Sequence, residues 1–426
     1  MKLIVVADDF TGANDTGVQF AKKNARTESV LVSGSPVSQR TDVIVINTES
    51  RALSSEAAKQ RVMDCVEPYL KHSELPLVYK KIDSTFRGNV GAEIDAVFEL
   101  TGARVAIVAG AIPGAGRITK QGLCYVNGVP LLDTEFASDP KTPIHSSRIQ
   151  DIISGQSCHP VEELHLSLVR EGSEVLQTRL AAIAAQQSSI VIIDAETDDD
   201  LAIIAEAALA LPQTKILVGA AGLANALPKQ SFMESDQPLP LLIVAGSMSE
   251  ATLRQVEHAQ QYMDVAVIDI AVEQFIQPTM RDRYLLGLTE QVAASLKENR
   301  HTILRTCQSR DTRHEVQALC DVYSITRNEL GSVIADHIGQ LMCRVIAAAR
   351  IGGLFLTGGD IAIAVANALG AKGYRISEEV MPCIPSGTFI DSEIDDLPVI
   401  TKAGGFGQIN TMCRAIEFIE GMYNES

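Results

Sequence analysis

The 426-residue sequence predicts an α/β protein of two αβ domains, each built on a largely parallel sheet. Three observations support this prediction. Short runs rich in β-branched residues alternate with segments of helical periodicity, the alternation stops at Pro228–Pro240, and it starts again after that segment. Continuous apolar strands separated by helices are typical of a parallel sheet covered on both faces. At roughly 150 residues per domain, the length also fits two or three domains.

The first domain is expected to span residues 1–230. Its expected strands are Leu3–Ala7, Val30–Val32, Val43–Asn47, Leu77–Lys81, Val105–Ala109, Ile190–Asp194 and Lys215–Val218. Its expected helices are Ser54–Leu70, Gly91–Leu100, Leu176–Gln187 and Asp198–Ala210. The segment Gly110–Arg148 is rich in Gly, Pro, Thr and Asp, and is expected to form excursions over one edge of the sheet.

The second domain is expected to span residues 231–426. Pro228–Pro240 contains three prolines and no periodicity, which indicates a linker. The expected strands are Leu241–Ala245, Val265–Asp269, Thr302–Arg305 and Leu354–Leu356. The expected helices are Glu250–Gln261, Asn328–Arg350, Asp360–Leu369 and Ile409–Tyr423. Between Gln277 and Arg327 the sequence carries no motif that indicates a function.

The composition excludes several function classes. The 36 Lys and Arg against 53 Asp and Glu give a net charge of −17, which opposes broad binding to nucleic acid or an anionic membrane. The absence of Trp, with 8 Tyr and 11 Phe, opposes a base-stacking platform. The sequence predicts a cytoplasmic protein for three reasons. Its eight cysteines form no CxxC pair, and its apolar N-terminal run is too short for a signal peptide. No apolar run approaches the ~18 residues of a membrane span.

Acidic residues follow the first expected strand. Asp8 and Asp9 come directly after an apolar run, and ligands of open α/β sheets bind outside the carboxyl ends of the strands. Two adjacent carboxylates cannot both be buried without partners, because the desolvation cost is too high. One interpretation is a helix N-cap with a solvated loop. The other is an acid that binds a ligand hydroxyl or acts as a base.

Two further strand ends carry basic and hydroxyl groups. Lys81, Ser84 and Arg87 follow one strand and precede a helix, with Asp83 as the acid among these donors. A helix N-terminus adds free N–H groups, so this segment predicts an anion pocket, with a surface Lys–Asp pair as the alternative. Arg51 follows another strand and can bind a carboxylate through a bidentate fork or form a salt bridge at the rim. Together the three strand ends predict a small, polar, anionic ligand such as a hydroxylated acid.

The C-terminal half contains four glycine-rich turns: Gly246–Ser249, Thr357–Asp360, Ser386–Thr388 and Lys402–Gly407. Glycine allows the backbone to approach a ligand closely, and successive N–H groups can bind phosphate oxygens. Each turn alone is weak evidence, but four in one domain indicate phosphate or nucleotide binding. Neither GxxxxGK[ST] nor GxGxxG is present, which argues against those two nucleotide-binding folds.

Other polar residues are interpreted structurally. His159 and His165 fit no metal-ligand spacing, and Asp198–Asp200 is expected to form the first turn of a helix, where acids complement the helix dipole. A Ser-His-Asp triad is not indicated, because no GxSxG sequence occurs.

The motifs taken together resemble the four-carbon acid sugar kinase family. The resemblance covers nearly the whole chain in the expected order. It rests on DDFTGANDTG at the start, KIDSTFRGNVG, the turn Gly116–Thr119, TGGD and KAGGFG. It implies an N-terminal domain that binds the acid sugar and a C-terminal domain that binds ATP, with the active site in the cleft between them.

The resemblance also implies roles for individual residues. The expected substrate-binding residues are Asp9, Arg51, Lys81, Ile82, Asp83 and Ser84. The expected ATP-binding residues are Ser247, Thr357, Gly358, Gly359, Asp360, Gly387, Gly404 and Gly405, with Gly387 the weakest. Asp9 or Asp83 would accept the hydroxyl proton, and the sequence does not choose between them. Mg²⁺ is expected with ATP, and Asp360 is a candidate contact for it, either directly or through water.

The implied reaction transfers the ATP γ-phosphoryl group to the terminal hydroxyl of a four-carbon sugar acid. D-Threonate is the expected substrate, and 4-hydroxy-L-threonine, L-threonate, erythronate and 3-oxo-tetronate are alternatives. A non-catalytic sugar-acid or nucleotide sensor and an NAD-linked dehydrogenase are hypotheses of other classes. Apolar helix faces can be core or interface, so the sequence leaves homo-oligomerisation open.

Overall fold

The computed structural model describes residues 1–35, 37–38, 40–70, 75–233, 238–308, 312–392 and 394–424. The chain divides into two compact units, one comprising Met1–Val37 with Thr41–Asp236 and the other Ser38–Arg40 with Gln237–Ser426. Both units are α/β, as the sequence predicts. Among the described residues, no helix has the length and apolar character needed to cross a membrane.

The N-terminal unit contains an eight-stranded sheet in the order β2-β3-β1-β4-β11-β5-β10-β9, and all neighbouring strands are parallel. Its strands are β1 (Leu3–Ala7), β2 (Thr27–Val30), β3 (Val43–Asn47), β4 (Leu77–Lys81), β5 (Val105–Ala109), β9 (Val161–Leu164), β10 (Ser189–Ile193) and β11 (Lys215–Gly219). The prediction of a strand over Val30–Val32 is therefore wrong in its bounds. Leu31 and Val32 lie beyond the end of β2 and their side chains are exposed. Their aliphatic character favours a strand in the sequence, but it does not reflect burial in the sheet.

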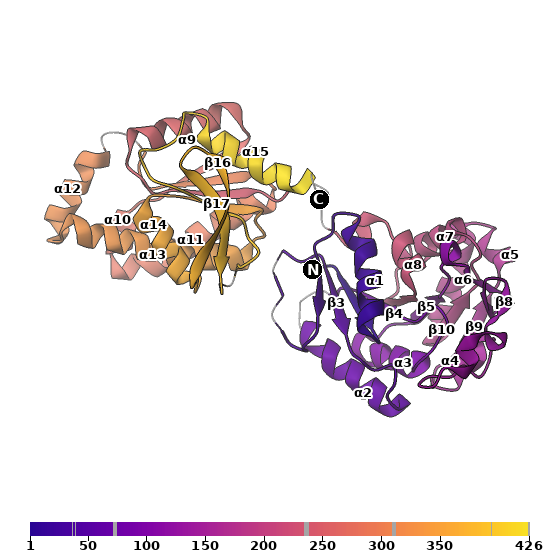
Figure 1. Ribbon diagram of the computed structural model, residues 1–426. Coiled ribbons are helices and arrows are strands. Elements are labelled where there is room, and N and C mark those ends of the chain that lie inside the picture. The colour runs from indigo at the N-terminus through magenta and orange to yellow at the C-terminus, as the bar shows by residue number, and fades with distance from the viewer. Residues whose placement is uncertain are drawn as a thin grey trace. The chain divides into compact units, whose positions relative to one another are not determined.

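Helices cover both faces of this sheet. They are α1 (Phe10–Ala21), α2 (Ser55–Val66), α3 (Val90–Thr101), α4 (Ile149–Ser154), α5 (Leu166–Val169), α6 (Ser173–Gln186), α7 (Asp198–Leu209) and α8 (Ala221–Ala226). Helices α1, α6, α7 and α8 bury apolar side chains against one face, and α2, α3 and α4 against the other (Figure 1). Alternate residues of β1 enter the two cores, Leu3 and Val5 one and Ile4 and Val6 the other, as expected for a strand covered on both faces.

The excursion predicted over Gly110–Arg148 forms a small antiparallel sheet. Its strands are β6 (Arg117–Lys120), β7 (Leu123–Val126) and β8 (Val129–Pro130). Single-turn 3-10 helices lie at Glu67–Tyr69, Pro113–Ala115, Leu131–Asp133, Glu135–Ser138 and Lys229–Ser231. The sheet of the excursion meets the main body where Thr119 exchanges backbone hydrogen bonds with Ala195.

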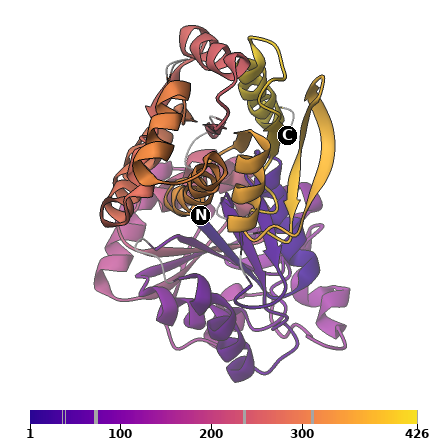
Figure 2. The same cartoon turned by 90° about the vertical axis from the view of Figure 1, so that its left-hand side faces the viewer.

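The C-terminal unit contains a seven-stranded sheet in the order β13-β14-β12-β15-β18-β17-β16. Its strands are β12 (Leu241–Ala245), β13 (Val265–Asp269), β14 (His301–Arg305), β15 (Gly353–Thr357), β16 (Gly373–Met381), β17 (Ile384–Ile390) and β18 (Val399–Lys402). The first five strands in the order are parallel to one another, whereas β17 is antiparallel to both β18 and β16. Figure 2 shows the β16–β17 hairpin as a long two-stranded ribbon at the edge of the sheet.

The helices of this unit also cover both faces of the sheet. They are α9 (Glu250–Tyr262), α10 (Glu273–Ile276), α11 (Pro278–Lys297), α12 (Thr312–Tyr323), α13 (Arg327–Ala348), α14 (Gly359–Ala368) and α15 (Thr411–Asn424). Helices α9 and α15 pack on one face, and α10, α11, α13 and α14 on the other (Figure 1). The segment without a recognisable motif, Gln277–Arg327, therefore supplies core helices, which explains why no site was visible there.

Candidate functional site

Three neighbouring strands of the N-terminal unit end at the same edge of the sheet. Strand β1 lies between β3 and β4, and its last residue, Ala7, is in register with Asn47 on one side and Lys81 on the other. The segments after the three strands therefore meet at the carboxyl edge, where open α/β sheets bind their ligands. This geometry brings together the three strand ends that the sequence indicates as a ligand site.

Arg51 binds both of the acids that follow β1. Its Nε and Nη2 donate to Asp8 Oδ2 and Oδ1 at 2.7 and 2.9 Å, and its Nη1 and Nη2 donate to Asp9 Oδ2 and Oδ1 at 2.8 and 2.9 Å. Burial alone would lower the pKa of Arg51, but the hydrogen bonds and charges of these acids raise it above its ordinary value. Four of its five N–H donors are engaged. A bidentate grip of Arg51 on a substrate carboxylate stays a prediction, and it would require some of these bonds to be exchanged.

The side chains of Asp9 and Lys81 both lie close to Gly12. Asp9 caps helix α1, since its Oδ1 accepts a hydrogen bond of 2.9 Å from the Gly12 N–H. A Cβ atom at position 12 would lie 2.5 Å from Asp9 Oδ1 and 2.8 Å from Lys81 Nζ, so only glycine leaves room for both groups. Both interpretations of the acidic pair therefore have support, because Asp9 is an N-cap and also faces the site.

Lys81 is the strongest candidate for binding an anionic ligand. The residue is only 5% exposed, and within the ranges that the structure describes its Nζ has neither a hydrogen bond nor an ion pair. Burial lowers its pKa, and the charges of Asp8, Asp83 and Asp9 partly oppose this. A buried ammonium group without a partner is costly, and an anionic ligand would relieve that cost.

Asp83 is held by residues of its own loop. Arg87 Nε donates to Asp83 Oδ2 at 2.8 Å, and the Thr85 hydroxyl donates to the same oxygen. Burial would raise the pKa of Asp83, but these two hydrogen bonds and the charges of Arg87 and Arg51 bring it below its ordinary value. Asp83 is therefore an anchored carboxylate anion at neutral pH.

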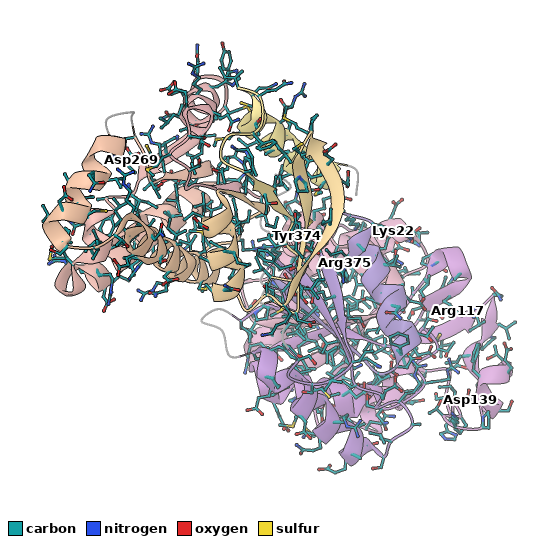
Figure 3. All side chains as sticks on the ribbon, turned by 60° about the vertical axis from the view of Figure 1, so that its left-hand side comes forward. Lys22, Arg117, Asp139, Asp269, Tyr374 and Arg375 are labelled. Carbon is teal, nitrogen blue, oxygen red and sulfur yellow. The ribbon has the colours of Figure 1, made fainter. Side chains whose placement is uncertain are left out.

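The loop after β4 is also held by a residue of the excursion over Gly110–Arg148. Arg87 Nη1 lies 3.0 Å from Asp139 Oδ2 of the excursion, whose position Figure 3 shows. Hydrogen bonds from the Thr142 and Lys141 N–H groups lower the pKa of Asp139 to about 2, so this partner stays charged. Phe86 has φ +56°, which costs free energy for a bulky side chain and indicates a loop that its surroundings hold in place.

The side chain of Ile82 cannot contact a ligand in this structure. It is 1% exposed and belongs to the core beneath the sheet, so its predicted role in substrate binding could only involve the backbone. Its N–H group is already bonded to Gly219 O at 3.0 Å. Ser84, by contrast, is partly exposed in the loop.

A buried ion pair that the sequence analysis missed lies beneath the site. Lys80 Nζ is 2.7 Å from Glu93 Oε2 of α3, and the two side chains are 0% and 2% exposed. Successive side chains of a strand point to opposite faces, so Lys80 and Lys81 could not both face the ligand. That alternation, with an acid in the first turn of the following helix, was the available signal. Burial raises the pKa of Glu93, and the charge of Lys80 opposes this rise.

The glycine turns of the C-terminal unit also meet at a carboxyl edge. Strand β15 lies between β12 and β18, with Thr357 in register with both Ala245 and Lys402. A Cβ atom at Gly404 would lie 2.1 Å from Ser247 Oγ, which shows that the turns after β12 and β18 touch. The Thr252 hydroxyl of α9 donates to Gly404 O at 3.0 Å and holds this contact.

Lys402 organises the turn after β18. Its Nζ donates to Ala403 O at 3.2 Å, Gly404 O at 3.0 Å and Phe406 O at 3.2 Å. The residue is 3% exposed, and burial lowers its pKa to about 8. Its N–H groups bind three carbonyl oxygens of the turn and so hold the turn in one conformation, together with the hydrogen bond from the Phe406 N–H to Ala403 O at 3.1 Å. The sequence analysis quoted this lysine in a motif and gave it no role.

The turn after β15 combines a constrained backbone with an unpaired hydroxyl. Gly358 has φ +100° and caps α14, which begins at Gly359, and Asp360 is exposed in its first turn. Thr357 is fully buried, and its Oγ1 has no hydrogen-bond partner within the described residues. A carboxylate oxygen and hydroxyls suit Mg²⁺, and N–H groups at a helix N-terminus suit phosphate, so the donor set fits both expected groups.

Gly387 has a packing role that accounts for it. It lies in β17, and a Cβ atom there would be 2.0 Å from Arg375 O and 3.0 Å from the Tyr374 ring. The ring passes over Gly387 so that the Tyr374 hydroxyl reaches Val399 O at 2.7 Å. Its predicted ATP contact stays a prediction. Gly405, by contrast, is exposed and has open space around it.

The residues interpreted structurally have partners. Asp198–Asp200 forms the first turn of α7, where Thr197 and Asp200 make a capping box. His165 Nδ1 lies 3.1 Å from Asp194 Oδ2. His159 lies near Asp95 and Cys158, but the Asp95 oxygens accept hydrogen bonds from the Ser157 hydroxyl and the Cys158 N–H, which hold the turn in place.

The chain therefore combines two α/β domains, and each has a candidate ligand site at the carboxyl edge of its sheet. The family model of a Sugar-binding N-terminal domain matches residues 3–227, and that of a Nucleotide-binding C-terminal domain matches residues 242–412. The chain belongs to the four-carbon acid sugar kinase family. The prediction of a phosphotransferase is therefore confirmed, and it is preferred to the hypotheses of a sensor and of a dehydrogenase.

Curated relatives resemble the chain over nearly its whole length. D-threonate kinase of Salmonella typhimurium is 54% identical, with 99% of each chain covered. D-erythronate kinase of Heliobacterium modesticaldum is 32% identical, with 98% of this chain and 97% of the relative covered. A solved structure from Salmonella typhimurium LT2 matches 97% of this chain and 98% of that chain at 22% identity and a TM-score of 0.50, which supports the fold.

Proposed function

We propose that this kinase transfers the γ-phosphoryl group of ATP to the 4-hydroxyl of D-threonate. The buried, unpartnered Lys81 ammonium beside Asp9 is the observation that carries this proposal, because it provides an anion site next to a carboxylate that can accept a hydroxyl proton. D-Threonate carries both groups that this pair would bind. The 54% identity to a D-threonate kinase supports this sugar acid over the other tetronates.

The proposed substrate site uses the strand ends of β1, β3 and β4. Lys81 binds the carboxylate of the substrate, and Ser84 donates or accepts a hydrogen bond at a substrate hydroxyl. Arg51 holds Asp9 and contributes positive charge. Asp83 orients Arg87 and the loop through its hydrogen bonds, and Ile82 contributes through its backbone alone.

The proposed nucleotide site uses the turns after β12, β15 and β18. Ser247, Gly404, Gly405 and the N-terminus of α14 at Gly358 and Gly359 bind the phosphates. Asp360 holds Mg²⁺ directly or through water. When bound, Mg²⁺ supplies positive charge that offsets the charge developing on the phosphate oxygens.

In the proposed step the 4-hydroxyl oxygen forms a bond to the γ-phosphorus, and the bond from that phosphorus to the bridging β,γ oxygen breaks. ADP leaves, and the hydroxyl proton passes to Asp9. We favour Asp9 over Asp83 as the proton acceptor for two reasons. The Asp9 side chain is 28% exposed, whereas that of Asp83 is 16% exposed, and Asp9 lies beside Lys81. Most of the catalysis is positioning and charge neutralisation, which requires the γ-phosphorus and the acceptor oxygen to come within bonding distance during turnover.

The test is ADP release by the purified protein with ATP and Mg²⁺. D-Threonate, L-threonate, D-erythronate, L-erythronate and 4-hydroxy-L-threonine are compared side by side. The proposal expects the highest kcat/KM with D-threonate and release of a 4-phosphate product identified by NMR. A higher kcat/KM with another substrate would replace D-threonate, and no turnover with any of them would overturn the substrate class.

A further inference from the structure

Three side chains that can bind a metal ion meet beside helix α3 of the N-terminal unit. Asp95 lies on α3, and Cys158 and His159 lie in the turn between α4 and β9, where α4 packs beside α3 (Figure 1). The ligand atoms that the three residues offer, a carboxylate oxygen, a sulfur and a ring nitrogen, all lie within 4.8 Å of one another. In the part of the chain that the structure describes, no other group of three or more Asp, Glu, Cys or His side chains meets so closely.

We propose that Asp95, Cys158 and His159 bind one divalent ion of the zinc type, with water in the fourth position. Thiolate and imidazole are ligands of Zn²⁺ and Co²⁺, whereas Mg²⁺ prefers oxygen ligands, so this site is separate from the Mg²⁺ expected with ATP. A thiolate and a carboxylate together balance the charge of a divalent ion. Cys158 is exposed, which gives the ion and the water a route from solvent.

Asp95 is buried and held in one orientation. The residue is 5% exposed, its Oδ1 accepts a hydrogen bond from the Ser157 hydroxyl, and its Oδ2 accepts one of 3.0 Å from the Cys158 N–H. A carboxylate offers about four lone pairs, so each oxygen keeps one for a metal ion. Carboxylates that bind metals are commonly oriented by such hydrogen bonds. The bonds that hold the turn therefore also direct the carboxylate.

His159 has the arrangement expected of a histidine that binds a metal through Nε2. Its Nδ1 lies 3.3 Å from Ser188 O, and because a carbonyl oxygen only accepts, this contact places the proton on Nδ1. Nε2 then carries the free lone pair. The Phe98 ring packs against the imidazole with centroids 4.3 Å apart and fixes its plane. A ring N–H bonded to a backbone carbonyl is the usual second contact of a metal-binding histidine.

Cys158 needs only a small movement to complete the site. Ligand atoms around a tetrahedral Zn²⁺ lie about 3.5 Å apart, and rotation of an exposed side chain can bring the sulfur to that spacing. A hydrogen bond from the thiol to Asp95 raises the pKa of Cys158 in the metal-free protein. Binding replaces this thiol proton with the ion, and the proton passes to solvent.

The turn that carries Cys158 and His159 also holds the loop after β4. Gln156 Nε2 donates to Gly88 O at 2.9 Å, and Gln156 Oε1 accepts a hydrogen bond of 2.9 Å from the Gly91 N–H. Gly88 belongs to that loop, and Gly91 lies in the first turn of α3. A bound ion would therefore tie the turn to α3 at a further point and restrain the end of the loop.

The first test uses the full-length protein after treatment with EDTA and removal of the chelator, with Co²⁺ as a spectroscopic probe. Co²⁺ bound to a thiolate gives a charge-transfer band in the near ultraviolet. The band should saturate at one Co²⁺ per chain, disappear when an equal amount of Zn²⁺ is added, and persist in excess Mg²⁺. Absence of the band, or its loss on addition of Mg²⁺, would overturn the proposal.

Variants identify the ligands. Cys158→Ala should lose the band, and Cys383→Ala, at another exposed cysteine, is the matched control and should keep it. His159→Phe keeps a ring against Phe98 but removes the nitrogen, so its Zn²⁺ affinity, measured by competition with a chelator, should fall about tenfold or more. A band that persists in Cys158→Ala, or an unchanged Zn²⁺ affinity in His159→Phe, would refute the site. Neither measurement uses turnover, so failure here leaves the proposed kinase reaction standing.

Hydrogen exchange measured by mass spectrometry tests the effect on the turn. Zn²⁺ should slow exchange of the amides between residues 155 and 161 in the wild type and should have no effect there in Cys158→Ala. Equal exchange in the wild type with and without bound Zn²⁺ would show that the ion does not restrain the turn.

Discussion

Arg51 and Asp9 form a bidentate ion pair, with Nη1 2.8 Å from Oδ2 and Nη2 2.9 Å from Oδ1. The same guanidinium holds Asp8 through Nε and Nη2, so one side chain from the segment after β3 fixes both acids that follow β1. Asp9 is therefore presented to the site in one orientation. A planar fork is needed for this geometry, and a lysine cannot reproduce it.

Replacing Arg51 with lysine should lower catalysis more than it lowers substrate affinity. Arg51→Lys keeps a positive charge, but its three N–H donors cannot replace all four hydrogen bonds that orient Asp8 and Asp9, and it lacks the planar fork. We expect kcat to fall about 10²-fold, the scale of a misplaced catalytic group, with a smaller change in the KM for D-threonate. Steady-state kinetics with D-threonate test this. Equal loss in kcat and in affinity would indicate instead that Arg51 binds the substrate directly.

The two candidate proton acceptors should respond differently to removal of charge. Asp9→Asn should lower kcat by roughly 10²-fold or more, since a general base is lost. Asp83→Asn should mainly raise the KM for D-threonate, because Asp83 holds Arg87 and its loop. The comparison is made at saturating ATP with folding checked by circular dichroism. If Asp9→Asn keeps full turnover while Asp83→Asn loses it, the roles are reversed.

Adding one methyl group at Gly12 should disrupt the substrate site. In Gly12→Ala the new Cβ would lie 2.5 Å from Asp9 Oδ1 and 2.8 Å from Lys81 Nζ, so one of these groups must move. We expect a rise of about tenfold or more in the KM for D-threonate, with an unchanged KM for ATP. Gly114→Ala is a suitable control, because a Cβ there meets no atom within 4 Å. Normal kinetics in Gly12→Ala would show that Asp9 and Lys81 do not act together.

The sequence predicts the fold well because its strongest signals are local. Apolar β-branched runs and helical periodicity gave most strands and helices within a few residues, and parallel pairing follows from their alternation. The β16–β17 hairpin was not predicted. Its strand Gly373–Met381 is mostly exposed or half-buried and contains Arg and Glu, so it lacks the apolar run by which the other strands were found.

The candidate sites were predicted less completely than the fold. Strand ends before helices can be located in a sequence, and Asp9, Arg51 and Lys81 all lie at such ends and come together. Pairing between distant residues cannot be located in this way. Contacts such as Lys80 with Glu93 and Gly387 with Tyr374 depend on which face of a strand each side chain occupies and on what packs against it.

Breaking the buried Lys80–Glu93 pair should destabilise the protein strongly. Lys80→Met leaves the Glu93 carboxylate buried without its cation, which costs about 3–5 kcal/mol of unfolding free energy for a pair of this kind. The double variant Lys80→Met with Glu93→Leu should recover much of that loss, because no charge then remains buried. Lys59→Met removes a partner from the exposed Lys59–Glu99 pair and should cost no more than about 1 kcal/mol. Urea unfolding compares the three variants, and a small effect of Lys80→Met would contradict the importance of the pair.

The affinity for nucleotide should fall as pH rises through about 8. Lys402 has its pKa lowered to about 8 by burial, and its ammonium group donates to three carbonyl oxygens of the turn after β18. Above that pH the amine is neutral and has fewer N–H donors, so the turn loses order and the KM for ATP rises. The KM for ATP, measured from pH 6.5 to 9.5, should show this inflection in the wild type.

The contribution of Lys402 to the free energy of unfolding should rise with pH over part of this range, whereas the affinity for nucleotide falls. This difference separates an effect on ATP binding from an effect on folding. The folded-state pKa of Lys402 lies below the ordinary value of 10.5, so between about pH 8 and 10.5 the unfolded chain holds a proton that the folded protein has released. The contribution of this group to unfolding free energy therefore increases with pH, and weaker ATP binding above pH 8 cannot be attributed to its effect on folding. Lys402→Met should raise the KM for ATP at every pH and abolish the inflection. An inflection that persists in Lys402→Met would assign the titration to another group.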